Sequence, residues 1–238
     1  MKSLITKGGK FGGLVKFKSP KCSLYSEHLR VSVVPPKRIV MGGKTERIIR
    51  LLSIYPSKKW TQRELACRAD VSLGLVNKVV KWLMSEGILV RASYYQRFYT
   101  FNPPKLLSSW AAQRKLLRAR SYPLAAAPEE VEGVLRDRGG YFMTLFCAAW
   151  HRVPHYRSAM IELYAKPDVA QAITRHFPRG RGATLIVYQY DRFLAEGMEK
   201  IDGLNLVSAV QNYVDLVAFG GIGADVAKKL AHKYKLGV

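Results

Sequence analysis

Cysteines and long apolar runs are scarce in this sequence, and each scarcity excludes a class of protein. Among its 238 residues are three cysteines, Cys22, Cys67 and Cys147, with no CxxC pair, so we expect neither a disulfide framework nor a zinc site. No apolar run approaches the ~18 residues that a membrane-spanning helix needs. The first residues are basic without an apolar core, so they do not predict a signal peptide. We therefore expect a cytoplasmic protein with no membrane partner and no metal.

Acidic residues are rarest in the first half of the chain. Residues 1–120 hold 25 Lys and Arg against 5 Asp and Glu, whereas residues 121–238 hold 14 against 12. Most of the net charge of +22 therefore lies in the first half. Such a charge favours a polyanionic partner whose counterions are released on binding, and we expect double-stranded DNA. A membrane surface is the rival polyanion, but no basic amphipathic helix with a broad apolar face supports it.

Residues 44–104 carry the strongest structural pattern in the sequence. Apolar periodicity and β-rich runs predict three helices, over 44–55, 61–68 and 72–85, and then a hairpin over 88–101. Thr61 and Glu64 have the spacing of a capping box. Ser72 is the predicted N-cap of the third helix, and Gly87 suits a left-handed stop after it. Helix, tight turn, helix and hairpin predict a winged helix-turn-helix.

The third helix of this unit has the two faces that a recognition helix needs. The predicted buried face consists of Val76, Val79, Val80 and Leu83. On the free face, Asn77 can bond bidentately to an adenine edge, and Lys78 can reach guanine or phosphate. Gly74 lets the backbone approach DNA closely. The candidate DNA-binding residues of the whole unit are Lys58, Lys59, Thr61, Gln62, Ser72, Gly74, Asn77, Lys78, Lys81, Arg91, Gln96 and Arg97.

The flanks of that helix supply the other candidates, each with a plainer alternative. Lys58 and Lys59 precede the Thr61 cap, where cations suit a phosphate bound at free N–H groups, although both could be solvated lysines. The polar side chains of the hairpin that could contact DNA are Arg91, Gln96 and Arg97. Its aromatic residues could stack on single strands, but in a hairpin core and cross-strand packing is the favoured interpretation. They are Tyr95, Phe98, Tyr99 and Phe101.

Two segments border the winged unit. Residues 1–43 are rich in Lys, Arg and Gly and contain one acidic residue, Glu27. One interpretation is a basic arm that lies along phosphates or in a minor groove of DNA. The other is a tail that only keeps the protein soluble. Residues 105–124 are expected to be a linker, with a helix over 105–120 that either joins the domains or packs against a second subunit of a homodimer.

Residues 125–238 predict an α/β domain. Helices are expected over 128–138, 168–177, 209–219 and 222–236, with a further helix from about Thr144, and strands at 141–143, 159–165 and 183–190. Ser208 and Gln211 have capping-box spacing. The carboxylates are scattered without a DxD pair, and no Gly-rich phosphate loop is present, so no cofactor is expected. His151 and His155 flank Pro154, and Cys147 lies in an apolar run, so none of them predicts a catalytic site.

Four segments together resemble the AbiEi-type antitoxins and regulators of type IV toxin–antitoxin systems. They are VSLGLVNKVVKWLMSEGIL, NPPKLLSSWAAQRKLLRAR, TLFCAAWHRVPHY before IELYAK, and DGLNLVSAVQNYVDLVAFGGIGADVAKKL, within about residues 44–235. The resemblance implies a winged helix that represses the promoter of its own operon. It also implies a C-terminal domain with a nucleotidyltransferase-like fold that counters a nucleotidyltransferase toxin. The basic arm over 1–43 departs from the family's pattern.

The preferred hypothesis is therefore a DNA-binding transcriptional regulator without enzymatic activity. One alternative is a nucleotidyltransferase-like enzyme that the winged helix delivers to nucleic acid. Such an enzyme is expected to carry a Gly-Ser motif followed by paired aspartates, and the sequence contains neither a Gly-Ser dipeptide nor a DxD. A second alternative is a replication initiator or chromatin protein, which fits the basic arm.

Overall fold

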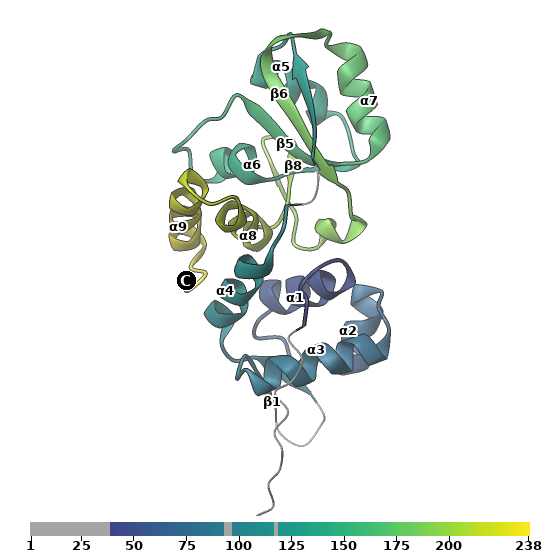
Figure 1. Cartoon of the computed structure of the whole chain (residues 1–238), viewed down its shortest axis with the longest axis vertical. Helices are drawn as coiled ribbons and strands as arrows, with labels where there is room; N and C mark the ends of the chain where they lie inside the picture. Colours follow the sequence, from purple (N-terminus) through teal and green to yellow (C-terminus); the bar gives the residue numbers. More distant parts are fainter. Residues whose placement is uncertain (1–38, 93–96, 117–118) are drawn as a thin grey trace, which may run out of the picture. The chain divides into compact units, whose positions relative to one another are not determined.

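The computed structural model describes residues 39–92, 97–116 and 119–238. Most of the basic arm predicted over 1–43 lies outside these residues, as do Tyr95 and Gln96 of the hairpin. The described chain is a mixed α/β structure, as predicted, with one two-stranded and one six-stranded sheet (Figure 1).

Three helices come first, at the predicted positions. They are α1 (Lys44–Ile54), α2 (Gln62–Ala69) and α3 (Leu73–Ser85). Thr61 Oγ1 accepts a hydrogen bond from the Glu64 N–H at 3.1 Å, and Ser72 Oγ accepts one from the Leu75 N–H at 3.3 Å, so both predicted N-caps are confirmed. Between α2 and α3, Asp70 adopts a left-handed φ of 52°, which Asp tolerates because its short side chain can bond locally. The connection is therefore short and fixed.

A short hairpin follows α3. Gly87 has a φ of 66°, in agreement with its predicted role as a helix stop. Strand β1 (Leu89–Arg91) pairs antiparallel with β2 (Phe98–Thr100), and Trp60 forms a further bridge to Phe98. The interpretation of the hairpin aromatics as core residues is right for Phe98, which is buried, and wrong for Phe101, which is 64% exposed.

These elements share one hydrophobic core with α4 (Pro103–Gln113), whose buried residues include Leu106 and Trp110. The predicted helix over 105–120 is wrong in its second half, because α4 ends at Gln113 and β3 (Arg120–Leu124) begins soon after. The buried residues of α4 are Leu106, Leu107, Trp110 and Ala111, so its apolar face ends within the observed helix, and most helical stability in proteins comes from such burial. Pairing of β3 with β6 (Arg179–Gln189) takes its place.

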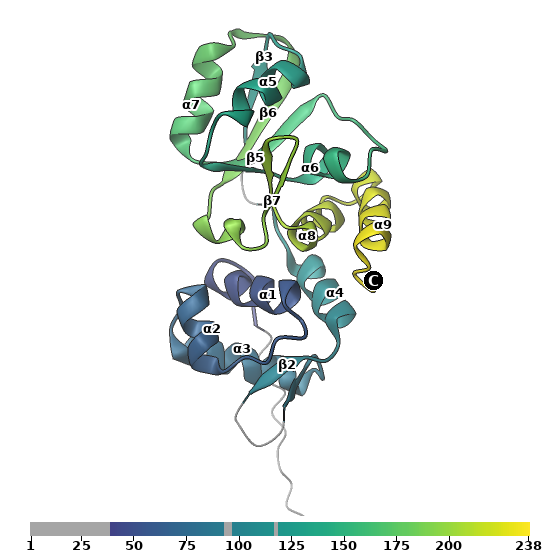
Figure 2. The same ribbon diagram turned by 180° about the vertical axis from the view of Figure 1, so that it is seen from behind.

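The larger sheet has the strand order β3-β6-β5-β4-β8-β7. Its remaining strands are β4 (Tyr141–Met143), β5 (Met160–Ala165), β7 (Glu199–Ile201) and β8 (Leu204–Leu206). Strands β5 and β6 are parallel, as are β4 and β8, and the other neighbours are antiparallel. The strands predicted in the second half are confirmed as β4, β5 and β6. Strand β3 and the β7–β8 hairpin at the far edge were not predicted (Figure 2).

Side chains on the two faces of this sheet enter two separate cores. Along β5, Leu163 and Ala165 pack with α5 and α7, whereas Tyr164 packs with α8 and α9. The alternation follows from the two-residue period of a strand. The helices are α5 (Pro128–Arg136), α6 (Leu145–Arg152), α7 (Pro167–His176), α8 (Ala209–Phe219) and α9 (Ile222–Tyr234), with a 3-10 helix η1 (Arg192–Ala195). Within the described ranges, no helix has the length and apolar character needed to cross a bilayer.

A buried polar network joins α1 and α4 to the sheet layer. Arg114 Nη1 lies 2.7 Å from Glu46 Oε2, and its Nε lies 2.9 Å from Asp215 Oδ1. Asp215 is 0% exposed and also accepts hydrogen bonds from Thr144 Oγ1 and Tyr164 Oη. Burial alone would lower the pKa of Arg114, but Asp215, Tyr164 and Glu46 raise it on balance. The carboxylates of the second half are scattered in the sequence, but Asp215 is not isolated in the fold, because it lies at the centre of this network.

Candidate nucleic-acid interface

The two predicted faces of α3 are present in the structure. Val76, Val79, Val80 and Leu83 are each at most 1% exposed and pack in the first core. On the other face, Gly74, Lys78 and Lys81 are exposed and Asn77 is half-buried. No acidic residue lies within α3. The free face is therefore polar and positively charged, as a helix that enters a major groove requires.

The first turn of α3 is open to solvent. Ser72, the N-cap, is exposed, and a Cβ added at Gly74 would meet nothing within 4 Å. Leu73, in the same turn, is 47% exposed. Sequence reasoning missed Leu73, because its spacing of three and seven residues from Val76 and Val80 fits the apolar period of α3 and gives no signal of exposure. An apolar side chain here can contact a thymine methyl group.

The start of α2 presents fewer free groups than predicted. Lys58 Nζ lies 2.7 Å from Glu64 Oε1 and 3.9 Å from the centre of the Trp60 ring. The hydrogen bond from Lys58 is the largest cause of a lowered pKa at Glu64. Lys58 thus already has an anionic partner, whereas Lys59 is exposed. Thr61 and Gln62 are half-buried at the N-terminus of α2.

The hairpin adds two cations beside this segment. Arg91 and Arg97 are both exposed, and Arg97 Nη1 donates a long hydrogen bond of 3.5 Å to the Lys59 carbonyl. Strand β1 contacts α3, and the two lie beside each other in Figures 1 and 2. Gln96 lies outside the described residues. The structure therefore brings Lys59 and Arg97 together, and it places the hairpin next to α3.

The residues examined for catalysis have structural contacts instead. His151 Nε2 lies 3.3 Å from Glu132 Oε1, and its Nδ1 lies 3.3 Å from Asp202 Oδ2. The hydrogen bond with Glu132 is the largest cause of a raised pKa at His151. Burial raises the pKa of the Cys147 thiol, which disfavours the reactive thiolate. No group of three His, Cys, Asp or Glu in the described ranges is placed to hold a metal ion.

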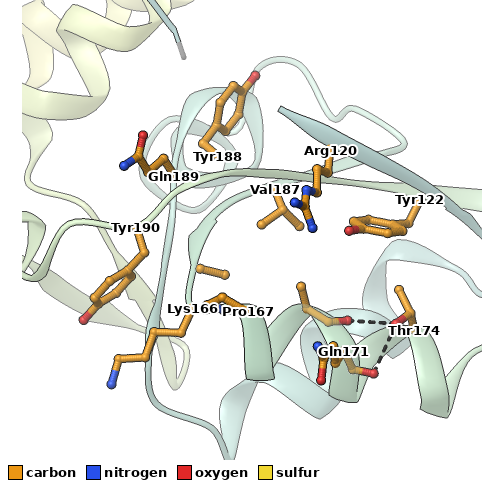
Figure 3. A pocket seen from close by; sticks show the side chains of 12 residues that line it. Arg120, Tyr122, Lys166, Pro167, Gln171, Thr174, Val187, Tyr188, Gln189 and Tyr190 are labelled. Atoms are coloured by element: carbon orange, nitrogen blue, oxygen red, sulfur yellow. Dashed lines mark hydrogen bonds between the residues drawn. The ribbon is translucent and has the colours of Figure 1, made fainter. Parts of the chain in front are cut away.

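A cavity of about 640 Å³ lies between α7 and the strands β3 and β6. Arg120, Tyr122 and Val187 line it on the strand side, opposite Gln171 and Thr174 of α7 (Figure 3). Lys166, Tyr188, Gln189 and Tyr190 complete its end. Its lining contains cations, amides and aromatic rings but no carboxylate, so it lacks the ligands that a two-metal phosphoryl-transfer centre requires. Comparison of the chain with protein-family models, with curated proteins and with solved structures found no match.

Proposed function

We propose that this protein is a sequence-specific, double-stranded-DNA-binding regulator of transcription whose residues 44–104 act as a winged helix-turn-helix. The observation that carries the proposal is the division of α3 into an apolar face buried in the core and an exposed face without acidic residues. A lone amphipathic helix would not suffice. Here the capped turn before α3 and the basic hairpin after it support the same interpretation.

In this proposal α3 enters the major groove with its N-terminal half. Asn77 reads a base edge, Lys78 and Lys81 contact a base or phosphates, and Gly74 lets the helix backbone approach closely. Lys59, Arg91 and Arg97 are exposed cations that contact phosphates and fix the register of the protein without reading sequence. Lys58 contributes less, because Glu64 already neutralises it.

The regulatory role is supported by the resemblance to AbiEi-type antitoxins, which also suggests a partner for the rest of the chain. We propose that residues 125–238 are a nucleotidyltransferase-like domain that counters a cognate nucleotidyltransferase toxin. Residues 121–238 carry nearly balanced charge, which suits a protein partner better than DNA. A toxin gene beside the gene for this chain, and loss of toxicity when both are expressed, would support this role.

The experiment begins by selecting duplexes from a random pool with the full chain. Fluorescence anisotropy then compares the selected duplex with a random duplex. Asn77→Ala should lose roughly 1–3 kcal/mol on the selected duplex and little on the random one, because Asn reads bases but carries no charge. Lys59→Ala, which removes a proposed phosphate contact, should weaken both duplexes by similar factors. Lys229→Ala, which removes an exposed charge from α9, is the matched control and should change neither.

Salt dependence gives a second test of the same proposal. The logarithm of the DNA affinity should fall linearly with the logarithm of the salt concentration, with a slope of ~0.9 for each phosphate neutralised. A flat response would exclude DNA as the main partner. Equal losses on both duplexes for Asn77→Ala, at an unchanged melting temperature, would mean that α3 does not read sequence.

A further inference from the structure

A second cavity, of about 530 Å³, lies where α1 faces the segment that follows β6. Its size is within the usual range for small-molecule sites. Cations dominate its lining, which includes Lys44, Arg47, Arg50, Arg114 and Arg192. The acidic residues of the lining are Glu46 and Asp191.

Most of these cations already have carboxylate partners. Arg47 Nε lies 3.1 Å from Asp191 Oδ2, and Arg192 Nη2 lies 2.8 Å from Asp70 Oδ2. Arg114 is paired with Glu46 and with Asp215, as described above. The nearby carboxylates are thereby engaged.

Lys44 is exposed and has no carboxylate partner among the described residues, and Arg50 is the one cation of this lining that is buried without one. Arg50 is 3% exposed, yet in the part of the chain that the structure describes no carboxylate lies within 4.0 Å of its guanidinium. Its Nε donates to Gln211 Oε1 at 2.9 Å, and its Nη1 donates a long bond of 3.5 Å to the Phe193 carbonyl. Burial lowers the pKa of Arg50 from its usual value, although Glu46 and Asp191 act in the opposite direction from a longer distance. A buried cation whose contacting acceptors are all neutral is costly, so this position favours an anion supplied from outside the chain.

The N-terminus of α1 opens into the same cavity. Its N-cap is Gly43, which lines the cavity and has no capping side chain, and the N–H groups of Thr45 and Glu46 donate to the carbonyls of Gly42 and Gly43 at 3.1 Å. The acidic residue of that turn, Glu46, is bonded to Arg114 and to Trp110 Nε1. The positive end of a helix dipole attracts a phosphate, and a guanidinium adds charge-assisted hydrogen bonds. Arg50 and the end of α1 are therefore independent indications of the same kind of ligand.

We propose that this cavity binds a small phosphorylated ligand, with its phosphate between the Arg50 guanidinium and the N-terminus of α1. The rings of Tyr164 and Tyr190 line the cavity and offer contact area to the rest of the ligand. Because α1 packs in the same core as α2 and α3, ligand binding is coupled to the proposed DNA-binding face. This regulatory part rests on the proposed function, whereas binding of the ligand does not.

The test is isothermal titration of the full chain with inorganic phosphate, AMP and succinate, without DNA. AMP should bind saturably, with inorganic phosphate weaker and succinate weakest. Arg50→Met should lower the AMP affinity at least tenfold, while the control Arg175→Met, which removes an exposed charge on α7, should leave it unchanged. Arg50→Lys keeps the buried positive charge but lacks the planar guanidinium that donates two parallel hydrogen bonds. It should also bind AMP more weakly, and it tests the site if Arg50→Met folds poorly.

Some outcomes would overturn the proposal. They are the absence of saturable binding by phosphate and AMP, equal AMP affinity in wild type and both Arg50 variants, or binding of succinate alone. Equal AMP affinity in wild type and both Arg50 variants would mean that AMP binds elsewhere on the basic surface of the protein. For coupling, AMP at saturation should change the affinity for the selected duplex, and the duplex should change AMP affinity by the same factor. AMP binding without DNA binding would refute the proposed function but support the ligand site. DNA binding without AMP binding would support the proposed function but refute the ligand site.

Discussion

Glu162 gives a prediction that does not depend on the function of the protein. It is 1% exposed on β5, and its Oε2 accepts hydrogen bonds from the Phe146 N–H at 2.9 Å and the Cys147 N–H at 3.2 Å, at the start of α6. Burial raises the pKa of this carboxyl from 4.5 to about 8, although those two hydrogen bonds act in the opposite direction. The folded protein therefore holds Glu162 largely as the neutral acid at pH 7.

The sign of the pH effect follows from this raised pKa. Below about pH 4.5 the carboxyl is protonated in both states, so its contribution to stability is fully present. As the pH rises towards 8 the unfolded state ionises and the folded state does not, which destabilises the fold by ~1.4 kcal/mol per pH unit. The loss by pH 7 amounts to roughly 3–4 kcal/mol, from the 2.5 pH units above 4.5. Glu162→Gln keeps the shape and the acceptor oxygen but cannot ionise, so it should remove this pH dependence.

The assay is urea unfolding of wild type and Glu162→Gln at several pH values from 5 to 8. The variant should gain stability relative to wild type by ~1.4 kcal/mol for each unit of pH, approaching a plateau near pH 8. The slope is the measured quantity, because a constant offset from the new amide group cancels. Asp168→Asn, an exposed carboxylate on α7, should parallel wild type. Parallel curves for wild type and Glu162→Gln would refute the reasoning.

Two further predictions test other parts of the structure. Gly74→Ala should raise the free energy of unfolding by roughly 0.5–1 kcal/mol, because the added Cβ meets open space in a helix, yet it should weaken DNA binding at least several-fold by blocking close approach. Urea unfolding and anisotropy measure the two effects, and improved stability with unchanged DNA affinity would remove Gly74 from the interface. Arg114→Met should cost roughly 3–5 kcal/mol of stability, because Glu46 and Asp215 lose their buried cation. Adding Asp215→Asn should recover part of that loss, and strictly additive losses would mean that the pair does not interact.

The sequence predicted local structure well where capping residues mark the ends of elements. Thr61, Ser72 and Ser208 each accept the hydrogen bond that an N-cap makes, at the start of α2, α3 and α8. These signals depend on residues a few positions apart, so they can be recognised without knowledge of the fold. The same holds for the buried face of α3 and for the strands β4, β5 and β6.

Short edge strands were missed for a physical reason. Strand β3 contains Pro123 and lies at the sheet edge, where a strand needs only one partner, so its sequence lacks the apolar alternation of a central strand. The β7–β8 hairpin had a usable signal, because Asp202 and Gly203 have φ of 51° and 81°, as the Asp-Gly pair of a tight hairpin turn does. In the sequence these two residues also open the last segment that resembles the AbiEi-type antitoxins, and a turn was not predicted there.

The buried network could not have been found from spacing at all. Glu46, Arg114 and Asp215 lie on three elements that are far apart in sequence, and in sequence each appears as an ordinary surface charge. Arg50 is the most instructive case, since in sequence it is one of many cations in a basic half. Only the fold distinguishes a solvated arginine, which marks a phosphate-binding surface, from a buried one that lacks a carboxylate. That distinction separates the predicted DNA interface, made of exposed cations, from the ligand site inferred beside α1.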